Sequence, residues 1–217
     1  MTFINPYIEK IQNNAHIIEE KEIAIKYKWN WNQYFGNSNP LHLEVGTGLW
    51  NFFSSQVKKY PHINFIGMEV KFKRVYKTSE KSSESWNTNF VVLKRRWQEI
   101  TDIFWPWEIE KSYIFFPDPW DKKDYQKKNK LLQIDFLKSL AEVTKEWWSF
   151  IFKTDHRKYF DEVIEIMKQI ASWKILRISY DYEKEIEDFD KQNLTEFEAL
   201  FRGEKKQICY LEVKKCV

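Results

Sequence analysis

The sequence predicts an α/β fold built on a doubly wound, mostly parallel sheet with helices on both faces. Short apolar runs alternate with helical patterns along most of the 217 residues, and such alternation is typical of parallel strands joined by crossover helices. Hydrophobic residues make up 43% of the chain, which is enough to form a substantial core. Polar and acidic residues follow several of the apolar runs, where parallel sheets bind their ligands.

The elements follow in order along the chain. We interpret residues 1–40 as an N-terminal extension and residues 41–217 as one domain. The predicted strands are 41–45, 64–70, 89–93, 112–116, 149–153, 173–180 and 207–213. The predicted helices are 51–59, 72–85, 131–143 and 160–170. Residues 181–203 form a charged excursion between the last two strands.

The composition excludes several classes of protein. No apolar run approaches the ~20 residues that span a membrane, and residues 1–10 lack the apolar core of a secretion signal, so we expect a cytoplasmic protein without a membrane partner. Two cysteines without a CxxC pattern and four scattered histidines predict neither a disulfide nor a metal site. A net charge of +3 is too small to indicate a partner.

A glycine turn closes the first predicted strand. Gly46 and Gly48 follow Glu44, and glycines allow a backbone to turn tightly beside a ligand. Glu69 ends the next strand, about 20 residues later, where a carboxylate can accept hydrogen bonds from ribose hydroxyls. The turn and this carboxylate together favour a cofactor that contains a nucleoside.

The turn favours S-adenosylmethionine over a dinucleotide. A dinucleotide fingerprint has a third glycine, G-x-G-x-x-G, but Asn51 occupies that position. Glu44 would repel a pyrophosphate and attract the sulfonium and ammonium groups of S-adenosylmethionine.

The segment after the fourth predicted strand holds a carboxylate between two prolines. Pro117 and Pro119 restrict the backbone on either side of Asp118, which Trp120 follows closely. A basic run comes next: Lys122, Lys123, Lys127, Lys128 and Lys130. A lysine run alone often lies on a solvated face, but beside a rigid acid and an aromatic ring it indicates contacts with a nucleic acid backbone.

These residues resemble the bacterial tRNA (guanine-N7-)-methyltransferases, a family of class I methyltransferases with a Rossmann-like sheet. The motifs that carry the resemblance are Leu43 to Gly48, Asn64 to Glu69, Phe116 to Trp120 with Lys122 and Lys123, Phe152 to Asp155, and Thr195 to Glu198. The resemblance implies methyl transfer from S-adenosylmethionine to N7 of a guanine in the variable loop of tRNA. It does not indicate whether the protein is a monomer or a homodimer.

The resemblance also implies a role for individual residues, with Asp118 as the catalytic carboxylate. Cofactor contacts are implied at Glu44, Gly46, Gly48, Glu69, Arg96 and Asp118. Substrate contacts are implied at Lys122, Asp155, Thr195, Glu196, Phe197 and Glu198. Without the resemblance, helix capping explains some of these residues: Thr195 and Glu198 have capping-box spacing, and Asp155 could start the following helix.

The chain departs from the family pattern at two kinds of position. Arg96 stands where the family usually has a carboxylate or an amide near the adenine. Six tryptophans fall where the family usually has glycine: Trp29, Trp50, Trp107, Trp147, Trp148 and Trp173. The chain has 11 tryptophans and only 5 glycines, and we hypothesise that several of these positions are glycine in the organism, encoded by UGA codons.

Two other functions remain open from the sequence. A catalytically inactive tRNA-binding relative would keep the basic face and lose the donor site, as Arg96 and Trp50 suggest. A nicotinamide-dependent oxidoreductase could use a similar sheet, although Glu44 and the missing third glycine argue against it.

Overall fold

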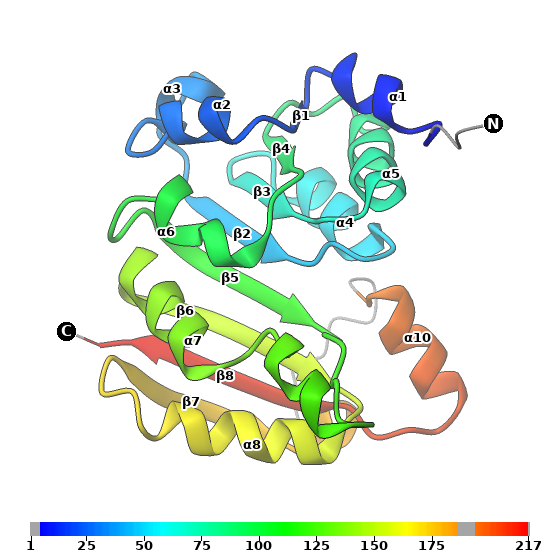
Figure 1. Cartoon of the computed structure of the whole chain (residues 1–217), viewed down its shortest axis with the longest axis vertical. Coiled ribbons are helices and arrows are strands. Elements are labelled where there is room, and N and C mark those ends of the chain that lie inside the picture. Colours follow the sequence, from blue (N-terminus) through cyan, green and yellow to red (C-terminus); the bar gives the residue numbers. More distant parts are fainter. Residues whose placement is uncertain (1–4, 186–193, 217) are drawn as a thin grey trace. The chain divides into compact units, whose positions relative to one another are not determined.

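The computed structural model describes residues 5–185 and 194–216. The chain divides into two compact units, residues 1–105 and residues 106–217, each with strands and helices (Figure 1). The predicted boundary at residue 40 remains a prediction. We describe each unit by itself.

The first unit contains four parallel strands in the order β1, β4, β3, β2. Its strands are β1 (Ile17–Ile18), β2 (Leu41–Val45), β3 (Asn64–Met68) and β4 (Phe90–Leu93). Its helices are α1 (Ile8–Gln12), α2 (Lys21–Lys26), α3 (Trp31–Phe35), α4 (Asn51–Lys59), α5 (Phe72–Ser83), the 3-10 helix η1 (Trp97–Glu99) and α6 (Ile100–Ile103).

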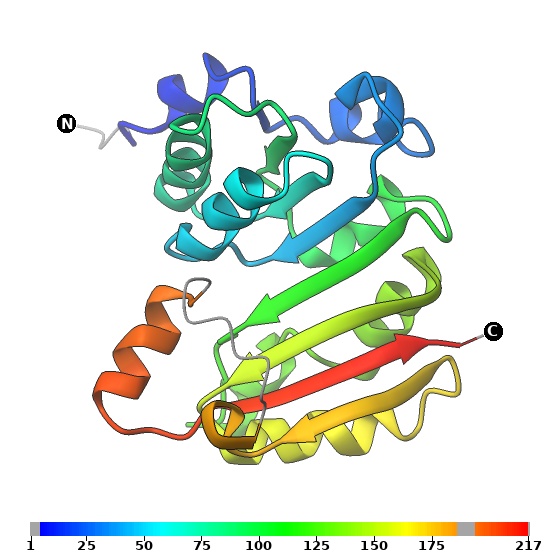
Figure 2. The same cartoon turned by 180° about the vertical axis from the view of Figure 1, so that it is seen from behind.

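The strands of the first unit are buried along their whole length. Every residue of β2, β3 and β4 is buried, as expected of parallel strands covered on both faces. Helices α4 and α5 lie on one face of these strands and α6 on the other (Figures 1 and 2). Phe53 and Val57 of α4 and Val75 of α5 pack with Phe65 and Phe90 in a core cluster.

The second unit contains two parallel and two antiparallel strands in the order β5, β6, β8, β7. Its strands are β5 (Ile109–Phe115), β6 (Thr144–Thr154), β7 (Trp173–Ser179) and β8 (Cys209–Lys215). Its helices are the 3-10 helix η2 (Asp124–Asn129), α7 (Ile134–Val143), α8 (Arg157–Met167), α9 (Tyr182–Glu185) and α10 (Glu196–Gly203).

Helices α7 and α8 cover one face of the second unit's strands (Figure 1). On α8 the buried side chains recur at helical spacing: Tyr159, Phe160, Val163, Ile164 and Met167. Helix α10 lies beyond the carboxyl ends of β5 and β6 in both views (Figures 1 and 2). The ends of β5 and β6 and this helix therefore enclose the segments that follow the two strands.

The predicted fold class is confirmed. All seven predicted strands and all four predicted helices are present, with ends that differ by a few residues. The prediction missed β1, which pairs with β4 inside the residues taken as an extension, and the short helices around it. It also missed α10 within the charged excursion, of which residues 186–193 lie outside the described residues.

Candidate functional site

The glycine turn of the first unit follows the carboxyl end of β2. Both glycines have left-handed backbones, with φ of 83° at Gly46 and 56° at Gly48. The Gly46 N–H donates to the Met68 carbonyl over 2.7 Å, which ties the turn to the end of β3. A Cβ built on Gly46 would meet no atom within 4 Å, so the backbone there faces open space. Such a turn lets a ligand approach the main chain.

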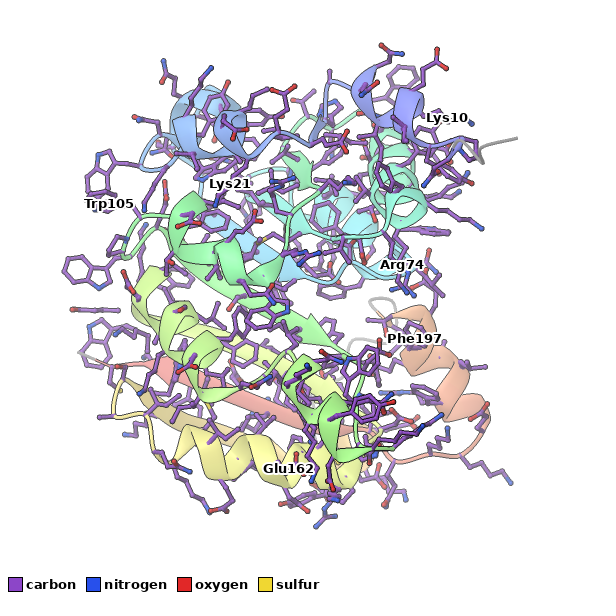
Figure 3. The ribbon with its side chains drawn as sticks, in the orientation of Figure 1. Lys10, Lys21, Arg74, Trp105, Glu162 and Phe197 are labelled. Atoms are coloured by element: carbon purple, nitrogen blue, oxygen red, sulfur yellow. The ribbon has the colours of Figure 1, made fainter. Side chains whose placement is uncertain are left out.

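Glu69 lies one residue beyond β3 and holds the neighbouring loops. Its buried carboxylate accepts hydrogen bonds from the N–H groups of Val70 (2.7 Å) and Lys71 (3.0 Å) through Oε1. Its Oε2 accepts from Gly48 N–H over a longer 3.4 Å, and Nη1 of Arg74 on α5 lies 3.8 Å from it (Figure 3 labels Arg74). The acid and the glycine turn predicted as cofactor contacts are therefore adjacent.

Glu44 and Arg96 lie on strands at the same edge of the first unit. Glu44 is the penultimate residue of β2, is buried, and pairs in register with Gly67. Arg96 lies three residues beyond β4 and is exposed. Because β2, β3 and β4 are parallel, their carboxyl ends bring Glu44, Glu69 and Arg96 to one edge.

The loop that carries Asp118 follows β5 in the second unit. The residues that flank its Pro-Asp-Pro sequence both have left-handed backbones, with φ of 50° at Phe116 and 43° at Trp120. The Phe116 N–H donates to the Lys153 carbonyl over 2.9 Å, and Asp118 itself is exposed. Strained backbone of this kind is characteristic of functional sites, and here it presents one carboxylate to solvent.

Asp155 does not cap the helix that follows it. His156 is the N-cap of α8, because its Nδ1 accepts the Tyr159 N–H over 3.1 Å. The capping interpretation of Asp155 was therefore wrong by one residue. Asp155 lies two residues beyond the register pair of Lys153 with Phe115, so it shares the carboxyl edge of β5 and β6 with the Asp118 loop. Nζ of Lys206 lies 3.6 Å from its carboxylate.

Thr195 caps α10, as its spacing to Glu198 predicted. The Thr195 hydroxyl oxygen accepts the Glu198 N–H over 3.0 Å. The Glu198 side chain is fully buried and accepts hydrogen bonds from Nζ of Lys153 (3.1 Å) and Nη2 of Arg202 (2.7 Å). This carboxylate therefore fastens α10 to β6.

The other two residues of the motif are partly exposed. Glu196 begins α10, and Phe197 on the next position contacts the ring of Phe116 at 6.3 Å between centroids (Figure 3 labels Phe197). Helix α10 therefore touches the Asp118 loop through aromatic rings, and Phe201 one turn further on makes a second contact at 5.4 Å.

The basic run divides into exposed and structural lysines. Lys122, Lys123 and Lys128 are exposed. Lys130 is buried, forms an ion pair with Glu162 of α8, and lies over the Tyr159 ring, so it is not available to a nucleic acid (Figure 3 labels Glu162). The prediction for the run thus holds, as a prediction, only for its exposed members.

Sequence reasoning missed the groups that position these segments. His156 links the Asp118 segment to α8, because its Nε2 lies 2.9 Å from Oδ2 of Asp121 while its Nδ1 caps the helix. Lys153 and Arg202 hold Glu198. A histidine directly before a helical pattern was the available signal for the first; the second depends on a contact between residues 45 apart and had no local signal.

Among residues 5–185 and 194–216, no group of three or more His, Cys, Asp or Glu side chains could hold a metal ion. No helix in the same residues is long and apolar enough to cross a membrane.

Sequence comparison identifies the family. The profile of a family described as "Putative methyltransferase" matches residues 38–211. A tRNA (guanine-N(7)-)-methyltransferase of Bacillus subtilis (strain 168) is 35% identical over 203 residues, which cover 91% of this chain and 93% of that protein. The chain belongs to the tRNA (guanine-N(7)-)-methyltransferase family. The family member from Lachnoclostridium phytofermentans is 32% identical and covers 89% of this chain and 87% of that protein.

A longer relative contains a similar sequence. A bifunctional glycosyltransferase/methyltransferase of Fusobacterium nucleatum is 33% identical over 98% of this chain, which spans 33% of that protein. The methyltransferase matches give no support to the inactive or the oxidoreductase alternative.

Solved structures show the same fold at low sequence identity. The 16S rRNA methyltransferase KamB has a TM-score of 0.64 at 13% identity, covering 87% of this chain and 94% of that one. A 16S rRNA (adenine(1408)-N(1))-methyltransferase from Catenulisporales acidiphilia, solved with S-adenosylmethionine, has a TM-score of 0.59 at 13% identity, covering 86% of this chain and 90% of that one. The fold of this family member is therefore that of Rossmann-like methyltransferases.

Proposed function

We propose that this chain acts in the cytoplasm and transfers a methyl group from S-adenosylmethionine to N7 of a guanine in the variable loop of tRNA. The observation that carries the proposal is the 35% identity to a tRNA (guanine-N(7)-)-methyltransferase over 93% of that enzyme's length. The Pro-Asp-Pro loop and the exposed lysines after it give the chain the groups that this substrate needs.

The first unit fits the methyl donor. The open backbone at Gly46 leaves room for the donor's main-chain contacts, and Glu69 has a buried carboxylate beside Gly48 that can accept hydrogen bonds from ribose hydroxyls. Glu44 supplies buried negative charge at the same edge, which suits a cationic ligand. In our proposal Arg96 marks the adenine end of the site through its backbone.

The chemistry requires little proton transfer by the protein. When bound, the donor supplies a sulfonium methyl group: the guanine N7 lone pair forms the new bond to carbon, the carbon–sulfur bond breaks, and sulfur keeps the electron pair. N7 carries no proton, so no general base is needed. The protein contributes mainly by holding the reacting atoms in line.

Asp118 is the proposed catalytic residue of this reaction. The carboxylate can accept hydrogen bonds from N1–H or the exocyclic amine of guanine, and its negative charge offsets the positive charge that the base gains. The prolines on both sides restrict its backbone before the substrate arrives.

The remaining proposed contacts hold the RNA. Lys122 contacts phosphate, and Asp155, Thr195, Glu196, Phe197 and Glu198 form the rest of the substrate-binding segment. Within that segment Glu198 acts through Lys153 and Arg202, because its carboxylate is fully buried. Oligomeric state does not enter this proposal.

The experiment uses unmodified tRNA and a donor labelled in its methyl group. Label should enter the RNA, and chemical cleavage at 7-methylguanine should place it in the variable loop. A matched tRNA with 7-deazaguanine at that position lacks the N7 acceptor and should remain unlabelled. Equal labelling of both RNAs would show that the acceptor is another atom and would overturn the proposal.

A further inference from the structure

Tryptophan occupies most of the left-handed backbone positions of this chain. Eight non-glycine residues among those described have positive φ, and six of them are tryptophan: Trp29, Trp50, Trp86, Trp107, Trp120 and Trp147. The whole chain has 11 tryptophans, so more than half of them adopt a conformation that bulky residues rarely adopt. Glycine is the residue that adopts it without steric cost.

Packing does not account for these conformations. Trp29, Trp86, Trp107 and Trp147 are 58% to 93% exposed, so most of each indole lies in solvent. A large apolar side chain gains stability by burial, and little burial is available here to offset backbone strain.

The local structure at these positions has the chemistry of glycine. Trp29 is the third residue of a turn closed by a hydrogen bond from Asn30 N–H to the Tyr27 carbonyl, and a positive φ at the third position requires glycine or asparagine. Trp147 lies in a stretch of β6 where the pairing with β5 shifts register between Ile109 and Lys111, and left-handed residues in such bulges are usually glycine.

Two other tryptophans show what a packed indole looks like in this chain. Trp31 is 1% exposed and stacks with aromatic neighbours. Trp173 is buried, contacts the Phe150 ring, and donates its indole N–H to the Leu137 carbonyl over 3.0 Å. Neither has positive φ, and Trp148 does not either. Backbone conformation therefore removes Trp148 and Trp173 from the positions suspected from the sequence, and adds Trp86.

We propose that residues 29, 50, 86, 107 and 147 are glycine in the protein as its organism makes it, encoded by UGA codons that this organism reads as glycine. Trp120 is not included. Its left-handed backbone belongs to the Pro-Asp-Pro loop, where Phe116 on the other side has the same conformation.

Position 50 connects this proposal to the donor site. Residue 50 is the N-cap of α4 with φ of 71°, directly after the turn of Gly46 and Gly48. Glycine is accepted at an N-cap, whereas tryptophan provides no side-chain cap there. Glycine would complete a G-x-G-x-G turn and leave the backbone open beside the donor. This consequence rests on the proposed function; the backbone argument does not.

The direct test is to read the gene and the native protein. The five codons should be UGA, whereas codons 31, 120 and 173 should be UGG. Peptide mass spectrometry of protein purified from its own organism should find glycine at the five positions. UGG codons at these positions, or tryptophan in the native peptides, would overturn the proposal.

Variants of the printed chain give a second test. Trp86→Gly and Trp147→Gly should each raise Tm by about 2 °C or more, because backbone strain is removed without loss of a packed side chain. Trp173→Gly is the matched control and should lower Tm, because it removes a buried ring. A fall in Tm for both test variants would contradict the assignment.

Donor binding separates this proposal from the proposed function. Trp50→Gly should bind S-adenosylmethionine at least about tenfold more tightly by calorimetry than the printed chain. If Tm rises in Trp86→Gly and Trp147→Gly while Trp50→Gly shows no donor affinity, the glycine assignment stands and the donor site is wrong.

Discussion

Glu198 and Lys153 form a buried ion pair that joins α10 to β6, with 3.1 Å between Lys153 Nζ and Glu198 Oε2. The Glu198 side chain is fully buried, and Arg202 donates to its other oxygen over 2.7 Å. One carboxylate thus neutralises two cations next to the segments that we propose to bind substrate.

Glu198→Gln should destabilise the protein by about 3 kcal/mol, because it leaves two cations without their buried partner. Urea unfolding measures the change. Glu204→Gln at the end of the same helix is the control, because its pair with Lys206 is exposed and contributes about 1 kcal/mol at most. If the two variants were equally stable, Glu198 would not fasten the helix.

Asp118→Ala should lower kcat/KM for tRNA methylation by about 100-fold and leave Tm unchanged, because the exposed carboxylate interacts with substrate and not with the core. Initial rates with labelled donor provide the measurement. Asp124→Ala, which removes another exposed acid a few residues later, should retain full activity. Full activity of Asp118→Ala would exclude the role proposed for it.

Lys122→Ala should weaken tRNA binding and reduce the slope of log affinity against log salt concentration by about one. Filter binding at several salt concentrations shows both effects. Lys58→Ala on α4 removes one exposed positive charge elsewhere and serves as the comparison. An unchanged slope for Lys122→Ala would mean that this lysine does not contact phosphate.

Gly67→Ala should destabilise the protein by about 1–3 kcal/mol and weaken donor binding, because its Cβ would lie 2.7 Å from Cγ2 of Thr47 in the glycine turn. Unfolding and calorimetry test the two effects. Gly203→Ala on α10 is the matched control: its Cβ would meet no atom within 4 Å, and alanine favours helix. Wild-type stability of Gly67→Ala would show that the turn can yield.

Cys209 should resist alkylation in the folded protein, because burial raises the pKa of its thiol to about 11. At pH 8 iodoacetamide should modify Cys216 first and Cys209 only after unfolding, as peptide mapping can establish. The raised pKa favours the folded state below about pH 9, and this contribution is lost as the pH rises through 11. Rapid labelling of Cys209 at pH 8 would contradict its burial.

The strongly patterned elements were predictable because their local signals agree with their burial. The ends of β2 and α4 were predicted correctly: Pro40 and Gly46 bound a fully buried apolar strand, and α4 follows the glycine turn directly. β1 was missed because two residues give no periodic signal and pair with β4 only in the folded chain. α10 was missed because charged residues surround it.

The site was predictable as residues but not as contacts. Sequence identified Asp118 and Glu69 from prolines and strand ends, which are local features. It could not show that Glu198 is occupied by Lys153, because the two residues are 45 positions apart. The choice of His156 over Asp155 as the cap depends on side-chain geometry that both sequences positions permit equally.

The unequal hydrogen bonds of Glu69 give the glycine turn a spectroscopic reporter. Oε1 accepts two short bonds from Val70 and Lys71, whereas Oε2 accepts only the long bond from Gly48. An arriving ribose would compete most easily for Oε2. Deuterium exchange at the Gly48 amide should therefore respond to donor titration while the amides of Val70 and Lys71 keep their protection, which would reveal occupancy without any turnover.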